Sequence, residues 1–217
     1  IKSDINDTQK YTNYLNNCDL AINIAAESHV DNSFISPLNF TKTNSLGAHA
    51  FFLECIKKKV KKILHVSSDE VYGEKVTGTC FENQLVNPTN PYSASKAAAE
   101  ILINSYKYTY KKEIIIVRAN NIYGIRQYPE KLISTSIVNL IHNKPIPIHG
   151  NGKNIRYYLS AEDFANALIL LVKKRDKGTF NVGSNFFEQN INIAKHICKI
   201  FKKNPKKFIK FTKDRLY

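Results

Sequence analysis

Short apolar runs alternate along this chain with longer segments whose apolar residues recur at helical spacing. The short runs have the length of buried β-strands and lie at residues 20–26, 63–66, 114–117 and 179–182. The longer segments predict helices and lie at residues 40–59, 91–110, 161–173 and 189–201. Strands and helices in alternation predict an α/β fold with a parallel sheet wrapped by helices.

Weaker patterns fill the rest of the chain. Residues 1–5 resemble a short strand, the polar residues 8–17 predict a surface helix, and residues 137–141 predict a short helix. Residues 120–124 are typical of a loop, and residues 145–154 contain two prolines and two glycines, which predicts a turn-rich excursion. We therefore expect a smaller lobe interleaved with the sheet.

The apolar run at 63–66 stops abruptly at two serines and two adjacent carboxylates, Asp69 and Glu70. Acids that directly follow a buried strand lie at its carboxyl end, where open α/β sheets bind their ligands. Strand alternation would point the two side chains in different directions, toward two atoms of one ligand. The alternative is a solvated junction between strand and loop.

A tyrosine and a lysine lie four residues apart near the start of the helix predicted at 91–110. Tyr92 and Lys96 therefore share one face of that helix. A neighbouring ammonium favours the phenolate and lowers the tyrosine pKa from about 10. Such a tyrosine can take the proton of an alcohol while a nicotinamide accepts the hydride. The same spacing recurs at Tyr108 and Lys112, so the spacing alone is not specific.

Composition and residue spacing disfavour nucleic-acid-binding, membrane-spanning, secreted and metal-binding proteins. The net charge of +14 favours nucleic acid as a partner, but the lysines are scattered and no nucleic-acid motif accompanies them, so we expect a solvated basic surface and no nucleic acid. No apolar run approaches the roughly 20 residues that span a membrane, and no signal peptide is apparent. The four cysteines are far apart, which is typical of reduced thiols in a cytoplasmic protein. His29 and His149 have no partners at ligand spacing, so we expect no metal.

Several motifs together resemble a known family. They lie at residues 25–31, 67–73, 90–96, 118–124, 127–133, 147–156 and 214–215. Through them the chain resembles the extended short-chain dehydrogenase/reductases and, within these, the dTDP-glucose 4,6-dehydratases. Sugar-nucleotide epimerases are similar around Tyr92 and Lys96 but lack the Asp69-Glu70 pair. Ser68 stands where these enzymes commonly have Thr and keeps the hydroxyl.

The resemblance implies a Rossmann-type doubly wound parallel sheet with a small interleaved substrate-binding lobe. Residues 1–119 and 155–183 would form the partial NAD-binding domain, and residues 120–154 and 184–217 the nucleotide-sugar lobe. The chain has no Met, and its eight glycines include no Gly-rich loop between a first strand and helix. We therefore expect a fragment that lacks the first βα units, binds NAD weakly by itself and is inactive alone.

The resemblance also implies a mechanism. Tyr92, assisted by Lys96 and Ser68, would deprotonate the sugar 4-hydroxyl as hydride passes from C4 to NAD. Glu70 would remove the C5 proton, Asp69 would protonate the departing 6-hydroxyl, and hydride would return to C6. The product of dTDP-glucose would be dTDP-4-keto-6-deoxyglucose.

Further site residues follow from the resemblance alone. The NAD-binding residues besides Tyr92 and Lys96 would be Asp4, Ile5, Ile24, Ala25, Ala26, Ser28, Thr43 and Asn121. The substrate-binding residues besides Ser68, Asp69 and Glu70 would be Ser28, Asn120, Asn121, Lys131, Leu132, Pro147, Ile148, His149, Arg156, Asn190 and Arg215. Guanidinium groups such as those of Arg156 and Arg215 bind diphosphates through paired hydrogen bonds.

Other functions remain open at this point. The chain is alternatively a nucleotide-sugar epimerase or decarboxylase of the same superfamily, or a non-catalytic homologue that binds a nucleotide or a protein. The intact catalytic residues disfavour the non-catalytic homologue, since a binding module has no need of both acids. The full-length protein is expected to be a homodimer. The sequence does not distinguish a thymidine from a uridine nucleotide.

Overall fold

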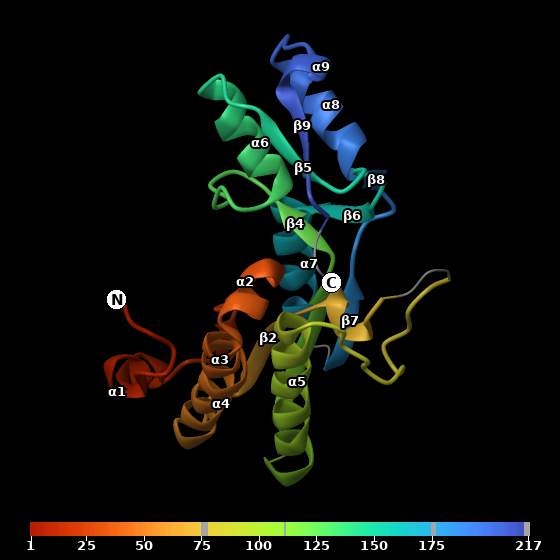
Figure 1. Ribbon diagram of the computed structural model, residues 1–217. Coiled ribbons are helices and arrows are strands. Elements are labelled where there is room, and N and C mark those ends of the chain that lie inside the picture. Colours follow the sequence, from red (N-terminus) through yellow and green to blue (C-terminus); the bar gives the residue numbers. More distant parts are fainter. Residues whose placement is uncertain (75–77, 111, 175–176, 215–217) are drawn as a thin grey trace. The chain divides into compact units, whose positions relative to one another are not determined.

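The computed structural model describes residues 1–74, 78–110, 112–174 and 177–214 and divides into two units (Figure 1). The first unit comprises residues 1–119 and 167–182, and the second comprises residues 120–166 and 183–217. Residues 155–166, which the sequence assigned to the NAD-binding domain, group with the second unit because their strand pairs with strands of that unit.

Four parallel strands form the sheet of the first unit. In spatial order they are β1 (Leu20–Asn23), β2 (Lys62–Ser68), β3 (Glu113–Ala119) and β7 (Gly178–Val182). All seven residues of β2 and six of the seven in β3 are buried. Such continuous burial is typical of central strands in a parallel sheet covered on both faces, and it confirms the predicted α/β fold.

Helices and helical turns make up much of the rest of the first unit. They are α1 (Thr8–Tyr11), η1 (Thr12–Leu15), α2 (Val30–Ile35), α3 (Pro37–Phe40), η2 (Thr41–Gly47), α4 (Ala48–Lys57), η3 (Asp69–Tyr72) and α5 (Pro91–Tyr110). Figure 1 shows α4 and α5 side by side. Phe52 of α4 and Ile103 of α5 join Ile63 of β2 and Ile116 of β3 in one buried cluster. Both helices therefore pack on the sheet face that carries Ile63.

The second unit has two small sheets. Strands β4 (Asn121–Tyr123), β6 (Ile155–Ser160) and β8 (Phe187–Gln189) form one, and β5 (Ile146–His149) pairs with β9 (Ile209–Thr212) in the other. The helices are α6 (Leu132–Ile141), α8 (Asn190–Ile200) and α9 (Pro205–Phe208), while α7 (Ala161–Lys173) spans the boundary between the units in sequence. Leu140, Ile146, Ile148 and Ile197 form the buried core of this unit.

Some sequence predictions were wrong. No strand forms at residues 1–5, whereas residues 120–124 and 145–154 contain the strands β4 and β5. β5 depends on β9, a partner too distant in sequence for local patterns to reveal. The single helix predicted at 40–59 is three elements, because the backbone widens into a π-helix at residues 41–47.

The structure also addresses membrane insertion. Within the described ranges, no helix has both the length and the apolarity needed to cross a bilayer.

Candidate active site

The two acids of the site lie on a short 3₁₀ turn, η3, directly after β2. Ser68, the last residue of β2, caps this turn: its Oγ accepts a hydrogen bond from the Glu70 backbone N–H at 3.2 Å. The same hydroxyl donates to Oδ1 of Asp69 at 3.3 Å. The acids therefore point in different directions because they are on a tight helical turn, and not because of strand alternation, as the sequence suggested.

The beginning of α5 is joined to Glu70 through Asn90. Oδ1 of Asn90 accepts from the backbone N–H of Ser93 at 2.8 Å, which caps the helix, and Pro91 takes the first helical position. Nδ2 of Asn90 donates to Oε2 of Glu70 at 3.3 Å. Sequence reasoning gave Asn90 no role, although an Asn directly before a Pro is a helix-start signal.

Lys96 lies beneath the end of β2. Its side chain is 3 % exposed, and Nζ donates to the carbonyl oxygen of Val66 at 2.6 Å. Burial lowers the pKa of Lys96 to about 8, and the nearby Glu100 carboxylate opposes that shift. Lys96 is therefore fixed by the strand that carries the acids.

The pKa of Tyr92 is raised, which corrects the lowered value expected from Lys96. Burial is the main cause, and the negative charges of Glu70 and Asp69 add to it. A hydrogen bond with Ser68 acts in the opposite direction. Tyr92 is consequently a neutral phenol at neutral pH in this structure, and its ring packs edge-to-face on Phe40 with 6.3 Å between centroids.

A buried ion pair between β3 and α5 connects to the turn η3 that carries the two acids. Nη2 of Arg118 on β3 donates to Oε2 of Glu100 on α5 at 2.6 Å, and the two side chains are 6 % and 2 % exposed. Nη1 of Arg118 also donates to the Tyr72 hydroxyl at 2.8 Å, which in turn donates to Asn181 at 2.7 Å. The network joins α5, β3, η3 and β7, so it fixes the turn that carries the acids.

The predicted cofactor residues of the first unit lie mainly at the carboxyl end of β1. Ile24, Ala25 and Ala26 are exposed on the loop that follows β1, while Ser28 and Thr43 are half-buried. Asn44 holds this loop: its Oδ1 accepts from the Glu27 N–H at 2.8 Å and its Nδ2 donates to the Glu27 carbonyl at 2.9 Å.

Two further cofactor candidates precede β1. Oδ1 of Asp4 accepts hydrogen bonds from the backbone and the side chain of Asn6, both at 2.8 Å, and these hold the pKa of Asp4 below its usual value. Ile5 lies against Gly47, where any Cβ would meet the Ile5 side chain. Gly47 therefore allows Ile5 to approach η2.

The remaining predicted site residues belong to the second unit, which is described by itself. Most are exposed or half-buried on β4, α6, β5, β6 and α8; they are Asn120, Asn121, Lys131, Leu132, Pro147, His149, Arg156 and Asn190. The Ile148 side chain is 2 % exposed in the core, so only its backbone can contact a ligand. Arg215 lies outside the described residues.

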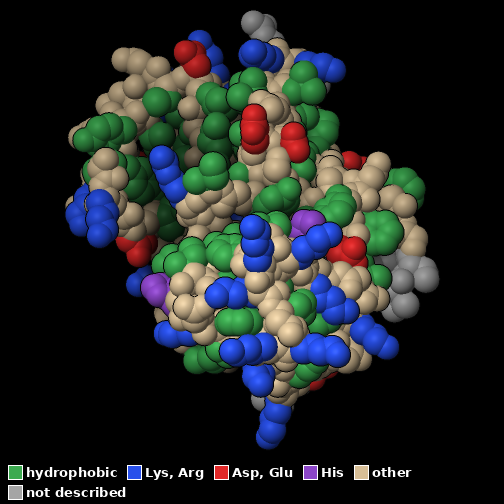
Figure 2. Space-filling view, turned by 90° about the horizontal axis from the view of Figure 1, so that it is seen from above, with side chains coloured by type: hydrophobic (Ala, Val, Ile, Leu, Met, Phe, Trp, Pro, Cys, Tyr) green, Lys and Arg blue, Asp and Glu red, His purple; other side chains and the backbone are tan. Residues whose placement is uncertain are grey.

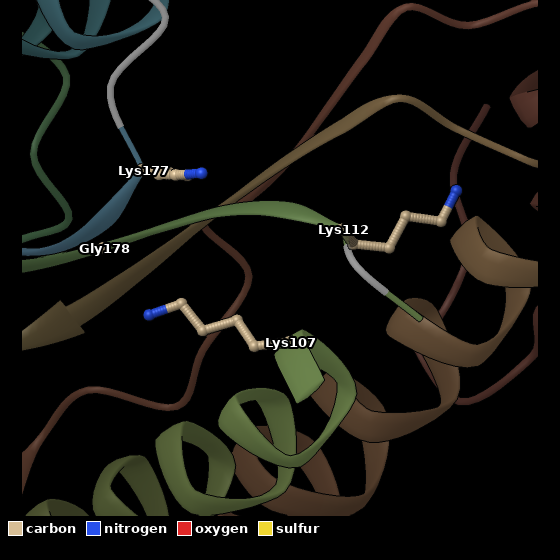
Figure 3. Close-up of a pocket in the computed structure, with 4 residues that line it drawn as sticks. All are labelled: Lys107, Lys112, Lys177 and Gly178. Carbon is tan, nitrogen blue, oxygen red and sulfur yellow. The ribbon is translucent and has the colours of Figure 1, made fainter. Parts of the chain in front are cut away.

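A separate cavity of about 430 Å³ lies at the other end of the sheet of the first unit (Figure 3). Lys107, Lys112, Lys177 and Gly178 line it, beside the amino ends of β3 and β7. Nζ of Lys112 donates to the Val60 carbonyl at 2.9 Å and points away from Lys107 and Lys177. The cavity is thus distinct from the site around Tyr92.

In the part of the chain that the structure describes, neither the distribution of charged side chains on the surface nor the arrangement of possible metal ligands indicates a second site. Lys and Arg side chains are spread over the face shown in Figure 2, with hydrophobic and other side chains between them. Among the described residues, no group of three or more His, Cys, Asp or Glu side chains is placed to hold a metal ion.

Comparison with known proteins places the chain in a family. The model of the family described as GDP-mannose 4,6 dehydratase matches residues 1–214. A trifunctional UDP-glucose 4,6-dehydratase/3,5-epimerase/reductase from Arabidopsis thaliana is 41% identical over 223 aligned positions, covering 99% of this chain and 33% of the relative. A dTDP-D-glucose 4,6-dehydratase from Dictyostelium discoideum is 44% identical, covering 84% of this chain and 45% of the relative.

A solved structure agrees closely with the fold. The crystal structure of a dTDP-glucose 4,6-dehydratase from Streptomyces venezuelae with NAD bound has a TM-score of 0.94 and 30% identity, covering 98% of this chain and 66% of that one. The chain spans between a third and a half of the length of the two curated relatives above.

Proposed function

This chain belongs to the GDP-mannose 4,6 dehydratase family, and from that premise we propose that its parent protein is an NAD-dependent nucleotide-sugar 4,6-dehydratase. The catalytic groups are Ser68, Asp69, Glu70, Tyr92 and Lys96. The observation that carries this proposal is that β2 ends in a hydroxyl and two carboxylates on one turn, with Glu70 bonded through Asn90 to the start of the Tyr92 helix. An alcohol oxidation needs only the tyrosine, whereas an elimination needs the acids as well.

The residues of the first unit fit the two ends of a dinucleotide. Parallel α/β sheets bind such ligands at their carboxyl edge, where the small exposed residues Ala25 and Ala26 follow β1. Asp4 is a charged acceptor suited to a ribose or adenine. Tyr92 lies close enough to Glu70 and Asp69 for their charges to raise its pKa, and Lys96 hydrogen-bonds the strand that precedes these acids. Asn121 is the remaining candidate and lies on β4 of the second unit. NAD, when bound, accepts the hydride from C4 of the sugar and returns it to C6.

The residues of the chain perform the proton transfers. Tyr92 takes the proton of the 4-hydroxyl. Its hydrogen bond with Ser68 lowers the pKa of the phenol, and Ser68 would donate to the phenolate by turning its one hydroxyl proton away from Asp69. Glu70 then removes the C5 proton, which the neighbouring C4 ketone makes acidic, and returns that proton to C5 when hydride is delivered to C6. Asp69 donates a proton to the 6-hydroxyl, which leaves as water. The two carboxylates thus have opposite protonation states, a division that their environments must set.

Because the pKa of Tyr92 is raised, Tyr92 can take the proton of the 4-hydroxyl only in a complex that places a further positive charge near its phenol. Glu70 and Asp69 disfavour the phenolate, and the Lys96 ammonium directs one of its three donors to the Val66 carbonyl. A cationic ligand near the phenol is the simplest way to offset the two carboxylates. We therefore expect Tyr92 to titrate at lower pH in the presence of NAD than in its absence.

Substrate recognition is assigned to the second unit. Arg156 is exposed, and its guanidinium hydrogen-bonds the adjacent Ile155 carbonyl at 3.0 Å, which leaves donors for phosphate oxygens. Further candidates of this unit lie at the start of α6 (Lys131, Leu132), on β5 (Pro147, His149 and the backbone of Ile148), at the start of α8 (Asn190) and before β4 (Asn120). Ser28 of the first unit is a candidate as well. Relatives act on UDP-glucose and on dTDP-glucose, so the nucleotide remains part of the test.

The test is incubation of the full-length protein with NAD and either dTDP-glucose or UDP-glucose, followed by mass spectrometry. The proposal predicts loss of one water from one or both sugars and no net reduction of NAD. A product of unchanged mass with inverted C4 stereochemistry would identify an epimerase, and binding without any product would identify a non-catalytic homologue.

We also expect a cytoplasmic homodimer. The four cysteines are free thiols, which suits a reducing compartment. The helices outside the sheet of the first unit leave large apolar side chains exposed, namely Leu38, Leu46 and Ile101. Such a surface favours association with a second copy. Sedimentation of the full-length protein at several concentrations, with Ile101→Glu as the disrupting variant, tests this expectation.

A further inference from the structure

Three buried polar side chains lie on the face of the first unit's sheet that α4 and α5 cover. Asn23 on β1 and His65 on β2 are 2 % and 1 % exposed, and Ser67 of β2 is 5 % exposed. Residues 63, 65 and 67 project from the same face of β2, and Ile63 packs there against α4 and α5. The proposed mechanism uses none of the three, although buried polar groups of this kind destabilise a fold unless they are hydrogen-bonded.

The hydrogen bonds of Asn23 fix the tautomer of His65. Oδ1 of Asn23 accepts from the backbone N–H of Ala25 at 3.2 Å, which identifies the carbonyl end of that side-chain amide. Nδ2 of Asn23 therefore faces Nδ1 of His65, at 3.2 Å, and donates to it. Because Nδ1 accepts a hydrogen bond, the single proton of the neutral imidazole must be on Nε2.

The other side of the imidazole has no protein partner among the described residues. Nε2 of His65 and Oγ of Ser67 are both buried and both lack a hydrogen-bond partner there. Lys96 lies nearby: its ammonium donates to the Val66 carbonyl, between these two residues in the chain, and its charge acts on His65. An N–H donor and a hydroxyl, both buried on one face of β2, together with a neighbouring ammonium, are groups of the kind that bind an internal water.

We propose that His65 is a positioning residue of the active site, with two contacts. Its Nδ1 orients the Asn23 amide and thereby holds the loop that carries Ala25 and Ala26, and its Nε2–H, together with Ser67 Oγ, binds a buried water beside the Lys96 ammonium. The role in catalysis rests on the function proposed above, whereas the tautomer and the water do not.

The surroundings of His65 keep it neutral. Burial lowers its pKa well below the usual value, and the positive charge of Lys96 acts in the same direction. Phe52 packs edge-to-face on the imidazole with 6.0 Å between centroids. A neutral ring can accept at Nδ1 and donate at Nε2 at the same time, which an imidazolium cannot do.

The first experiment is ¹⁵N NMR of the imidazoles in the full-length protein, with His65→Phe to assign the signals. The expected spectrum shows His65 as the neutral Nε2–H tautomer at pH 6 to 8. An Nδ1–H tautomer or an imidazolium in this range overturns the proposal. A crystal structure should show one water bonded to His65 Nε2 and Ser67 Oγ, and a dry site there overturns the second contact. Neither readout depends on turnover, so both remain valid if the proposed function fails.

The second experiment measures the positioning. His65→Phe keeps the ring packing but loses both contacts, so we expect the Kd for NAD to rise about tenfold, as for the loss of one buried hydrogen bond. His65→Gln can still accept from Asn23 and donate to the water, and it should restore the Kd to within about threefold of the original. His196→Phe, on the exposed face of α8, is the control. Equal affinities for His65→Phe and the original protein, or no rescue by His65→Gln, would contradict the role.

Discussion

The proposed catalytic residues of the first unit and the proposed substrate residues of the second differ in how the fold holds them. Glu70 hydrogen-bonds Asn90 before α5, Lys96 of α5 hydrogen-bonds the Val66 carbonyl of β2, and Ser68 hydrogen-bonds Tyr92 of α5. Arg156 is exposed, and its guanidinium hydrogen-bonds the adjacent residue's carbonyl. Groups that transfer protons must hold their geometry before the substrate arrives, whereas groups that bind a diphosphate acquire their partners with it.

This difference predicts which property each substitution changes. Changes at the proposed catalytic residues and at the buried ion pair of the first unit should affect the rate constant of the chemical step or the folding free energy. Changes among the exposed residues of the second unit should affect the affinity for substrate and leave stability nearly unchanged.

The largest effect is expected from Tyr92→Phe in the full-length protein. Loss of the hydroxyl removes the general base, which contributes about 10²–10⁴-fold to kcat. Tyr108→Phe is the matched control, since Tyr108 has the same four-residue spacing to a lysine but lies in the last turn of α5. Steady-state kinetics of both variants measure the effect. Equal losses would show that Tyr92 is not the general base of this reaction.

Glu100→Gln should strongly destabilise the fold. It leaves the buried guanidinium of Arg118 without its counter-charge, a change that costs about 3–5 kcal/mol in the free energy of unfolding. Denaturant unfolding measures it, with Glu74→Gln at an exposed position as the control. A loss below about 1 kcal/mol would mean that the ion pair does not support the site.

Arg156→Gln should have a smaller effect, confined to binding. We expect KM for the nucleotide sugar to rise about tenfold, the loss of one charge-assisted contact, while stability changes by less than about 0.5 kcal/mol. Arg126→Gln removes another exposed arginine of the second unit and should leave KM unchanged. A fall in kcat with constant KM for Arg156→Gln would remove the distinction between the two regions.

The smallest expected effect is on stability below about pH 6.5. The folded pKa of His65 is depressed below the unfolded value of about 6.5, so the unfolded chain binds a proton that the native state does not. Stability should therefore fall as pH decreases from about 6.5 toward the folded pKa, and less so in His65→Phe. Urea unfolding at several pH values measures this, and identical pH dependence in the two proteins would contradict it.

Local signals in the sequence predicted part of the fold and site well. The helix at 91–110 was predicted with its observed bounds, because Pro at the first position and an Ala-rich segment act locally. The π-helix η2 and the pairing of β5 with β9 were missed, since both depend on contacts between distant residues. The predicted shift of the Tyr92 pKa had the wrong direction, because sequence spacing shows neither the burial of Tyr92 nor the position of Glu70.

The most direct test of the central claim compares Glu70→Gln with Asp69→Asn in the presence of NAD and the nucleotide sugar. Glu70→Gln should allow oxidation at C4 but block elimination, so that reduced-nicotinamide absorbance accumulates. Asp69→Asn should slow loss of water while NAD still binds. If both variants lose water from the sugar at the rate of the original protein, the turn after β2 does not carry the acid and base of this reaction.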